Sequence, residues 1–188
     1  MQKFIVEGGV NLSGVITPSG NKNEALPVLA AALLANEPVK INNVPEILDI
    51  SIMKALLSGI GTEIKQLDKH SCYIDPSKIN NNPDPKNAIR IRGSFLLAGP
   101  LLARKKSVVL PSPGGDRIGL RPVQTHLLAL EKLGTRINLN NKGIYEMETD
   151  GLKGAEIYLD EASVMATENS IMAAVTAQGR TIIYNAAC

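Results

Sequence analysis

The sequence predicts an α/β fold in which a helix–strand unit is repeated around a shared core. A Leu-Leu-Ala helix end, a polar turn and a β-like run follow one another at residues 33–41 and 101–110, and more weakly at 173–183. Further along each of the first two units, the Gly-Thr-x-Ile pattern of residues 61–64 recurs at 134–137. Each unit therefore reads as helix, strand, helix, strand, with a glycine ending the second helix. Units of this length are too long for a solenoid and favour pseudo-symmetric packing.

The helices are predicted by caps and apolar stripes. Residues 22–34 are rich in Ala and Leu, follow the candidate N-caps Ser19 and Asn21, and carry Pro27 near the start, where a missing N–H costs least. A second helix is expected at residues 48–60 and a third at 122–133, both with apolar side chains at helical spacing. Ser163 is a natural cap for a helix that follows it.

Short β-like runs complete the units. They lie at residues 4–6, 14–16, 72–74 and 157–159. Residues 80–87 contain Pro83 and Pro85 and are expected to form a surface loop. The third unit stops soon after its first strand, which predicts that the chain is either truncated or one piece of a longer enzyme.

Composition excludes several classes of protein. The chain has 188 residues, 44% of them hydrophobic, 20% charged and only 3% aromatic, so its core must be built from aliphatic side chains. A net charge of +2 argues against a nucleic-acid or membrane partner, and any anion binding must be local. Cys72 and Cys188 are far apart and have no metal-ligand spacing, which indicates a reducing compartment. With no predicted signal peptide or membrane span, we expect a cytoplasmic protein.

The loop at residues 113–122 is the strongest candidate for chemistry. It combines glycines at 114, 115 and 119 with Asp116, Arg117 and Arg121. Glycines let backbone N–H groups approach an anion, the arginines can neutralise a phosphate or carboxylate, and the aspartate would be an acid or base beside it. The alternative is an ordinary Asp-containing surface turn.

Cations also stand where helices are expected to begin. Lys22, Arg92 and Arg121 occupy such positions in successive units. A lysine is unfavourable at a helix N-terminus unless an anion binds there, so the three side chains could converge on one anionic ligand. The alternative for Lys22 is a solvated side chain on a turn. His126, a lone histidine without a ligand-spaced partner, is interpreted as a packing or hydrogen-bonding residue and not as a metal ligand; no metal or cofactor is expected.

Several motifs together resemble one family, the UDP-N-acetylglucosamine 1-carboxyvinyltransferases. The motifs cover residues 19–27, 92–94, 99–101, 110–115, 118–123, 152–155 and 181–187. The resemblance implies an enolpyruvyl transferase of peptidoglycan synthesis with two lobes, each an inside-out α/β barrel of three βαβαββ units. Residues 1–21 would belong to the second lobe and residues 22–188 to most of the first. The general-base Asp and further arginines would lie beyond residue 188, so the fragment alone is expected to be inactive.

The resemblance also implies roles for individual residues. Lys22 would bind phosphoenolpyruvate, Asn23 the sugar, and Arg92 and Arg121 the anionic groups of the two substrates. The uridine end would lie against six further residues, namely Pro122, Val123, Gln124, Thr125, Ser163 and Val164. Asp116 stands where the family usually has a Cys; a carboxylic acid with a pKa raised by burial can also donate a proton to C3 of phosphoenolpyruvate. Fosfomycin is an epoxide that alkylates the Cys of the family. Because a carboxylate is not alkylated as a thiolate is, we expect the full-length enzyme to resist it.

Two alternatives stay open. The sister family that acts on shikimate 3-phosphate shares the fold but usually has Ser beside the lysine, where this chain has Asn23. A non-catalytic module that binds a nucleotide sugar is the other. Many UDP-N-acetylglucosamine 1-carboxyvinyltransferases have Lys where this chain has Glu161, and Asp where it has Gln124. These two differences affect the expected contacts with the nucleotide and leave the expected reaction class unchanged.

Overall fold

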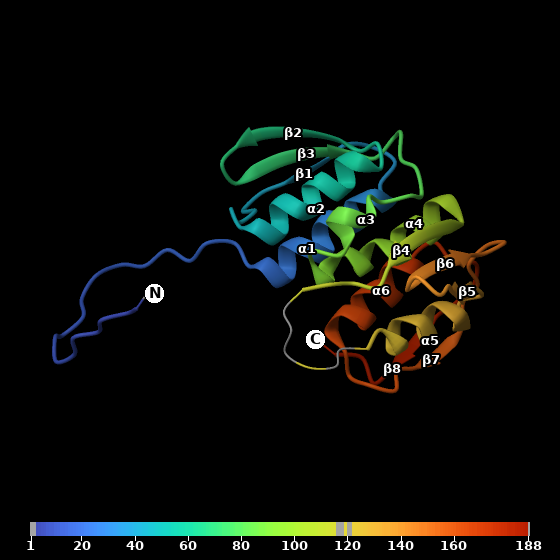
Figure 1. The fold of residues 1–188 in the computed structure, drawn as a ribbon. Helices are drawn as coiled ribbons and strands as arrows, with labels where there is room; N and C mark the ends of the chain where they lie inside the picture. The colour runs from blue at the N-terminus through green and yellow to red at the C-terminus, as the bar shows by residue number, and fades with distance from the viewer. Residues whose placement is uncertain (1–2, 116–118, 120–121, 188) are drawn as a thin grey trace.

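The first repeat unit consists of helices packed beneath an antiparallel sheet (Figure 1). The computed structural model describes residues 3–115, 119 and 122–187. In the sheet, β3 lies between β1 and β2, with Ile41 opposite Cys72 and Ile64 opposite Ile74. The elements of this unit are α1 (Lys22–Ala31), the 3-10 helix η1 (Ala32–Leu34), β1 (Val39–Ile41), α2 (Leu48–Gly59), β2 (Glu63–Asp68) and β3 (Ser71–Asp75).

The second unit repeats this order. A short helix, α3 (Pro85–Ala88), leads into it. Its sheet has β6 in the middle, with Leu110 opposite Tyr145 and Ile137 opposite Met147. Its elements are η2 (Arg92–Leu97), α4 (Ala98–Lys105), β4 (Ser107–Pro111), α5 (Gln124–Lys132), β5 (Arg136–Leu139) and β6 (Ile144–Glu148).

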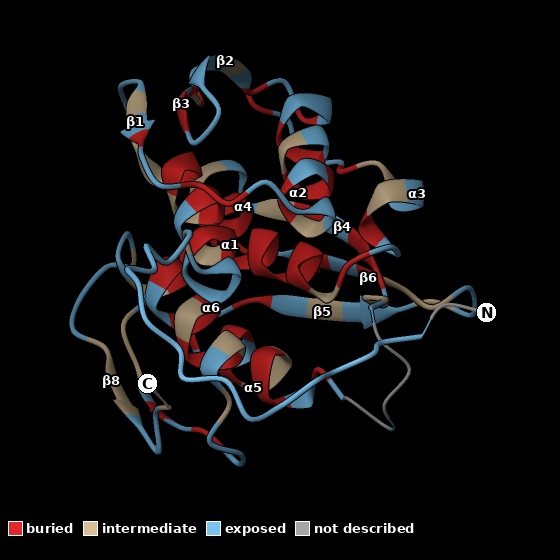
Figure 2. Cartoon of the chain, turned by 90° about the vertical axis from the view of Figure 1, so that its left-hand side faces the viewer, coloured by how far each residue is buried: buried red, intermediate tan, exposed pale blue. Residues whose placement is uncertain are grey.

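The third unit is represented by a parallel pair of strands and one helix. Strands β7 (Glu156–Tyr158) and β8 (Ile182–Tyr184) place Ile157 opposite Ile183, and α6 (Val164–Ala174) connects them. Among the described residues, the three sheets lie on the outside and the helices between them (Figure 1). Buried residues accordingly concentrate on the helices, among them α1, α2, α4 and α6 (Figure 2). The predicted mixed α/β arrangement of repeated units is confirmed.

The glycines that end the second helix of each unit show the repeat most clearly. Gly61 and Gly134 both have φ of +95°, a conformation that glycine adopts without steric cost. The threonine that follows each of them, Thr62 or Thr135, is buried in both units. The Gly-Thr-x-Ile pattern therefore marks the same helix-to-strand turn twice.

A buried asparagine joins the helices at the centre. Asn169 on α6 is fully buried; its Oδ1 accepts from the N–H of Gly99 at 2.7 Å and its Nδ2 donates to the carbonyl of Phe95 at 3.0 Å. A side chain at Gly99 would place its Cβ 2.5 Å from the backbone oxygen of Asn169, so glycine permits this close approach of α4 and α6. A buried amide is tolerated here because its groups are paired.

Three predictions of local structure need correction. Residues 4–6 and 14–16 are not strands: residues 3–19 run as an extended, exposed segment that pairs with no described strand (Figure 1). A β-like run becomes a strand only where another strand supplies hydrogen bonds. The expected loop at 80–87 contains the start of α3, because Asp84 caps it and Pro85 suits its first position.

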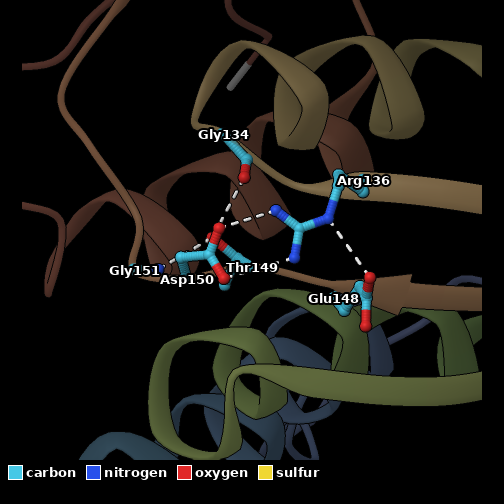
Figure 3. Close-up of polar contacts among 6 residues, drawn as sticks. All are labelled: Gly134, Arg136, Glu148, Thr149, Asp150 and Gly151. Carbon is cyan, nitrogen blue, oxygen red and sulfur yellow. Dashed lines mark hydrogen bonds and ion pairs between the residues drawn. The ribbon is translucent and has the colours of Figure 1, made fainter.

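Charged side chains gather on the outer sheet of the second unit. Arg136 on β5 lies between two carboxylates, with Nη1 2.7 Å from Asp150 and Nε 3.1 Å from Glu148 (Figure 3). The guanidinium lowers the pKa of the Asp150 carboxyl, and the two carboxylates raise the pKa of Arg136. All three side chains are exposed, so water and salt screen these ion pairs.

No helix in the described part of the chain is long and apolar enough to span a membrane.

Candidate functional site

Two adjoining cavities lie where several helices begin. The larger, of about 620 Å³, brings together side chains from both units and from α6. The smaller, of about 280 Å³, lies next to it, and Arg92, Val164 and Met165 line both. Backbone N–H groups at helix starts are unpaired within the helix and favour anions, so this arrangement suits a negatively charged ligand.

The first wall of the larger cavity is formed by the starts of α1 and α2. The Asn21 side chain caps α1 by accepting from the N–H of Asn23 at 2.8 Å, and this fixes Lys22 at the first helical position. The Lys22 ammonium lies 3.1 Å from Oδ2 of Asp49, the second residue of α2. Both side chains remain partly exposed, at 45% and 34%, so the ammonium is accessible to a ligand.

Arg92 forms the boundary between the two cavities. It is the first residue of η2, and its Nη2 donates to the carbonyl oxygen of Pro122 at 2.9 Å. A side chain at Gly115 would bring its Cβ within 3.3 Å of the Arg92 Cβ, and Gly115 has φ of +100°. Arg92 thus lies close to Gly115 and is bonded to Pro122, two residues of the glycine-rich loop at 113–122.

The smaller cavity offers hydroxyls and carboxylates. Ser163 caps α6 by accepting from the N–H of Ala166 at 3.3 Å. The buried Thr125 hydroxyl donates to Oδ1 of Asp160 at 2.7 Å. This bond leaves the hydroxyl oxygen of Thr125 able to accept from a ligand. Glu161 also lines the cavity.

His126 closes the inner side of the smaller cavity. It is almost fully buried, lies edge-on to Phe95 and has Nδ1 3.2 Å from Nδ2 of Asn169. Burial, together with the nearby positive charge of Arg92, lowers its pKa to about 4. The ring is therefore neutral, with Nδ1 as the acceptor of the Asn169 amide. The interpretation of His126 as a packing residue is confirmed.

The predicted site residues are brought together in part. Lys22, Asn23, Arg92 and Val164 line the larger cavity. Pro122, Thr125 and Ser163 line the smaller one, again with Arg92 and Val164.

Two predicted residues stand apart from this group, and two others fall outside the part of the chain that the structure describes. Val123 is buried in the core, and Gln124 is exposed at the start of α5; neither lines either cavity. Asp116 and Arg121 lie outside the described residues. The convergence of cations at helix starts is thus observed for Lys22 and Arg92.

Three charged residues of the larger cavity were not predicted. They are Asp49, Arg90 and Glu168. The Arg90 guanidinium bonds to Oδ1 of Asn87 at 3.2 Å, and burial raises the pKa of the Glu168 carboxyl. Glu168 lies within the first turns of α6 and belongs to no recognisable motif. A signal was present, however: its neighbours Thr167, Asn169 and Ser170 are polar residues in an otherwise apolar helix.

Comparison with curated proteins gives relatives of one name. The UDP-N-acetylglucosamine 1-carboxyvinyltransferase of Bradyrhizobium diazoefficiens is 48% identical over 186 residues, which cover 98% of this chain and 43% of the relative. The protein of the same name from Treponema denticola is 45% identical over 188 residues, covering 100% of this chain and 44% of the relative. The chain therefore spans less than half the length of these relatives.

Solved structures with the same fold are enolpyruvyl transferases. The enolpyruvyl transferase NikO from Streptomyces tendae matches with a TM-score of 0.78 and 22% identity, over 94% of this chain and 42% of that one. The EPSP synthase from Acinetobacter baumannii matches with a TM-score of 0.72 and 20% identity, over 90% of this chain and 40% of that one. At these identities the likeness concerns the fold alone.

The comparison with protein families covers most of the chain. The model of one family matches residues 6–188, which include every described helix and strand. The chain belongs to the EPSP synthase (3-phosphoshikimate 1-carboxyvinyltransferase) family.

Proposed function

We propose that the chain forms the N-terminal part of an enzyme that transfers the enolpyruvyl group of phosphoenolpyruvate to the 3-hydroxyl of UDP-N-acetylglucosamine, a step of peptidoglycan synthesis. The observation that carries the proposal is the meeting of Lys22, Asn23 and Arg92 in one cavity. The names of the relatives at 45% and 48% identity support the choice of acceptor.

The proposed reaction needs cations at two stages. The sugar hydroxyl adds to C2 of phosphoenolpyruvate while C3 gains a proton; phosphate then leaves from C2 as C3 loses a proton, which restores the double bond. Lys22 and Arg92 would hold the phosphate and carboxylate throughout. Fixed cations in a partly enclosed site stabilise the charge that develops on the departing phosphate.

The proton at C3 would come from Asp116, and Arg121 would add a further cation to the ligand. The support is positional in sequence: both residues follow Gly115 within a few positions, and Gly115 lines the larger cavity. A carboxylic acid can serve as general acid where its surroundings raise its pKa. We propose that the base that accepts the hydroxyl proton is supplied by the part of the protein beyond this chain.

The uridine end of the substrate would occupy the smaller cavity. Thr125 and Ser163 offer hydroxyl groups there, and Pro122 and Val164 offer apolar surface. Val123 and Gln124 would act through backbone position, because they flank the start of α5 beside the cavity.

We also propose the two-lobed arrangement for the longer protein. Residues 22–188 would form most of one barrel-like lobe, and residues 1–21 would pack on the other. The support for the second point is the exposure of apolar side chains in that segment, with Phe4 100%, Leu12 94%, Val15 95% and Ile16 91% exposed. Apolar surface of this kind favours a packing partner. Such an enzyme would act in the cytoplasm.

Transfer to shikimate 3-phosphate is the second candidate, because the family model that matches carries that name. A calorimetric titration of the chain with each compound separates the two. The proposal expects binding of UDP-N-acetylglucosamine and none of shikimate 3-phosphate; the reverse result would overturn it. A second experiment joins the chain to the remaining part of the Bradyrhizobium relative; we call the product the joined protein. Turnover by the joined protein would indicate an enzyme, and its absence would indicate a non-catalytic binding module.

A further inference from the structure

We propose that Glu168 is a specificity residue that accepts a hydrogen bond from the hexosamine of the nucleotide-sugar substrate. This inference rests on the proposed function and assigns a role within it to a carboxylate that no sequence motif singled out. Glu168 lies on α6 and lines the larger cavity together with Lys22, Asn23 and Arg92.

The position of Glu168 is fixed by its neighbours. Thr167 bonds to the carbonyl of Ser163 at 2.9 Å and accepts from the N–H of Ala187 at 3.0 Å. Asn169 is anchored on Phe95 and Gly99, as described above. The backbone on both sides of Glu168 is thus held by tertiary contacts. A side chain presented from such a segment is well suited to select a ligand.

The carboxylate of Glu168 has no protein partner within the described residues: no hydrogen bond or ion pair joins it to any of them. It is nevertheless half-buried, and this burial raises its pKa. Removing a carboxylate from water without a partner is unfavourable. The cost would be offset in a complex in which a ligand donates a hydrogen bond to it.

The ligand group follows from the chemistry of the substrates. Phosphoenolpyruvate and the diphosphate are anionic acceptors, and they would be directed to Lys22 and Arg92. The donors are the hydroxyls of the hexosamine and of the ribose, the acetamido N–H and the N–H of uracil. The uridine, with its ribose and uracil, would lie in the smaller cavity, which Glu168 does not line. This leaves a hydroxyl or the acetamido N–H of the hexosamine, the part that must lie next to phosphoenolpyruvate to react.

The test compares UDP-N-acetylglucosamine with UDP, which lacks the sugar, in calorimetric titrations of the 188-residue chain. We expect the unmodified chain to bind the sugar nucleotide more tightly than UDP. Glu168→Ala should lower affinity for the sugar nucleotide about tenfold to a hundredfold, the usual value of a hydrogen bond to a charged group, and leave UDP binding unchanged. Glu168→Gln keeps an acceptor oxygen and should restore part of the loss. Glu131→Gln, on an exposed position of α5, is the matched control.

The outcomes separate this inference from the function on which it rests. If Glu168→Ala keeps the full difference between the two ligands, or if the unmodified chain binds both equally, the role of Glu168 is overturned and the proposed function stands. If the unmodified chain binds neither, both fall. In the joined protein, Glu168→Ala should raise KM for UDP-N-acetylglucosamine and leave KM for phosphoenolpyruvate unchanged, a split that loss of folding would not produce. A parallel rise in both KM values would contradict a contact with the sugar.

Discussion

The Nζ atom of Lys22 lies 3.1 Å from Oδ2 of Asp49, so the proposed anion-binding lysine is paired with a carboxylate of the neighbouring helix. The pair joins the first turns of α1 and α2. A ligand phosphate must compete with Asp49 for the ammonium. This relationship makes Asp49 a restraint on the strength of anion binding.

Asp49→Asn should therefore strengthen the binding of phosphoenolpyruvate by up to about fivefold, because removing a partly exposed ion pair changes the interaction free energy by about 1 kcal/mol or less. Calorimetric titration of the chain measures this change, with Asp68→Asn, on β2, as a control outside the cavity. Weaker binding in Asp49→Asn would show instead that Asp49 orients Lys22 for the ligand.

The stability of the chain should fall between pH 6.5 and pH 4 because of His126. Its pKa is about 4 in the folded state, compared with an ordinary value of 6.5. In that interval the unfolded chain binds the proton more readily, so acid favours unfolding. The shift corresponds to about 3 kcal/mol, gained as pH rises through the interval.

Urea unfolding at several pH values checks this expectation. His126→Gln cannot titrate there, so the difference between its pH dependence and that of the unmodified chain isolates the histidine. Equal slopes of the free energy of unfolding against pH in the two proteins would contradict the account.

Asn169→Ala should destabilise the chain by roughly 2–4 kcal/mol, because it leaves the N–H of Gly99 and the carbonyl of Phe95 buried without partners. Asn138→Ala, on an exposed position of β5, should change the free energy of unfolding by less than about 0.5 kcal/mol. Thermal and urea unfolding compare the two variants. If Asn169→Ala lowered the free energy of unfolding by less than about 1 kcal/mol, water would have to replace the amide as the hydrogen-bond partner of Gly99 and Phe95.

Fosfomycin should not inactivate the joined protein. Asp116 stands where the family usually has the Cys that fosfomycin alkylates. Cys72, the cysteine that the structure describes, is buried and therefore offers no accessible thiolate. Asp116→Cys should introduce time-dependent, irreversible loss of activity, measured after removal of free inhibitor. Time-dependent inactivation of the protein that retains Asp116 would contradict the expectation.

The sequence predicted those parts of the fold that local chemistry determines. The caps Asn21 and Ser163 and the glycines at 61 and 134 set helix ends through contacts within a few residues, and all four are found as expected. Residues 4–6 were wrongly expected to form a strand, because pairing depends on a partner that may be distant in sequence.

The candidate site also contains some residues that local sequence predicts and others that only the tertiary structure brings in. Lys22 and Arg92 could be predicted because they belong to motifs at helix starts. Asp49 and Glu168 could not, because their relevance depends on how α2 and α6 are placed around the cavity. That placement is determined by tertiary contacts such as those of Asn169, which no local pattern specifies.

The release of inorganic phosphate from phosphoenolpyruvate by the joined protein tests the central claim most directly. The account predicts release that requires UDP-N-acetylglucosamine, is absent with shikimate 3-phosphate, and falls at least about a hundredfold in Lys22→Ala and in Arg92→Ala. Release that depends on shikimate 3-phosphate, or that persists undiminished in both variants, would contradict it.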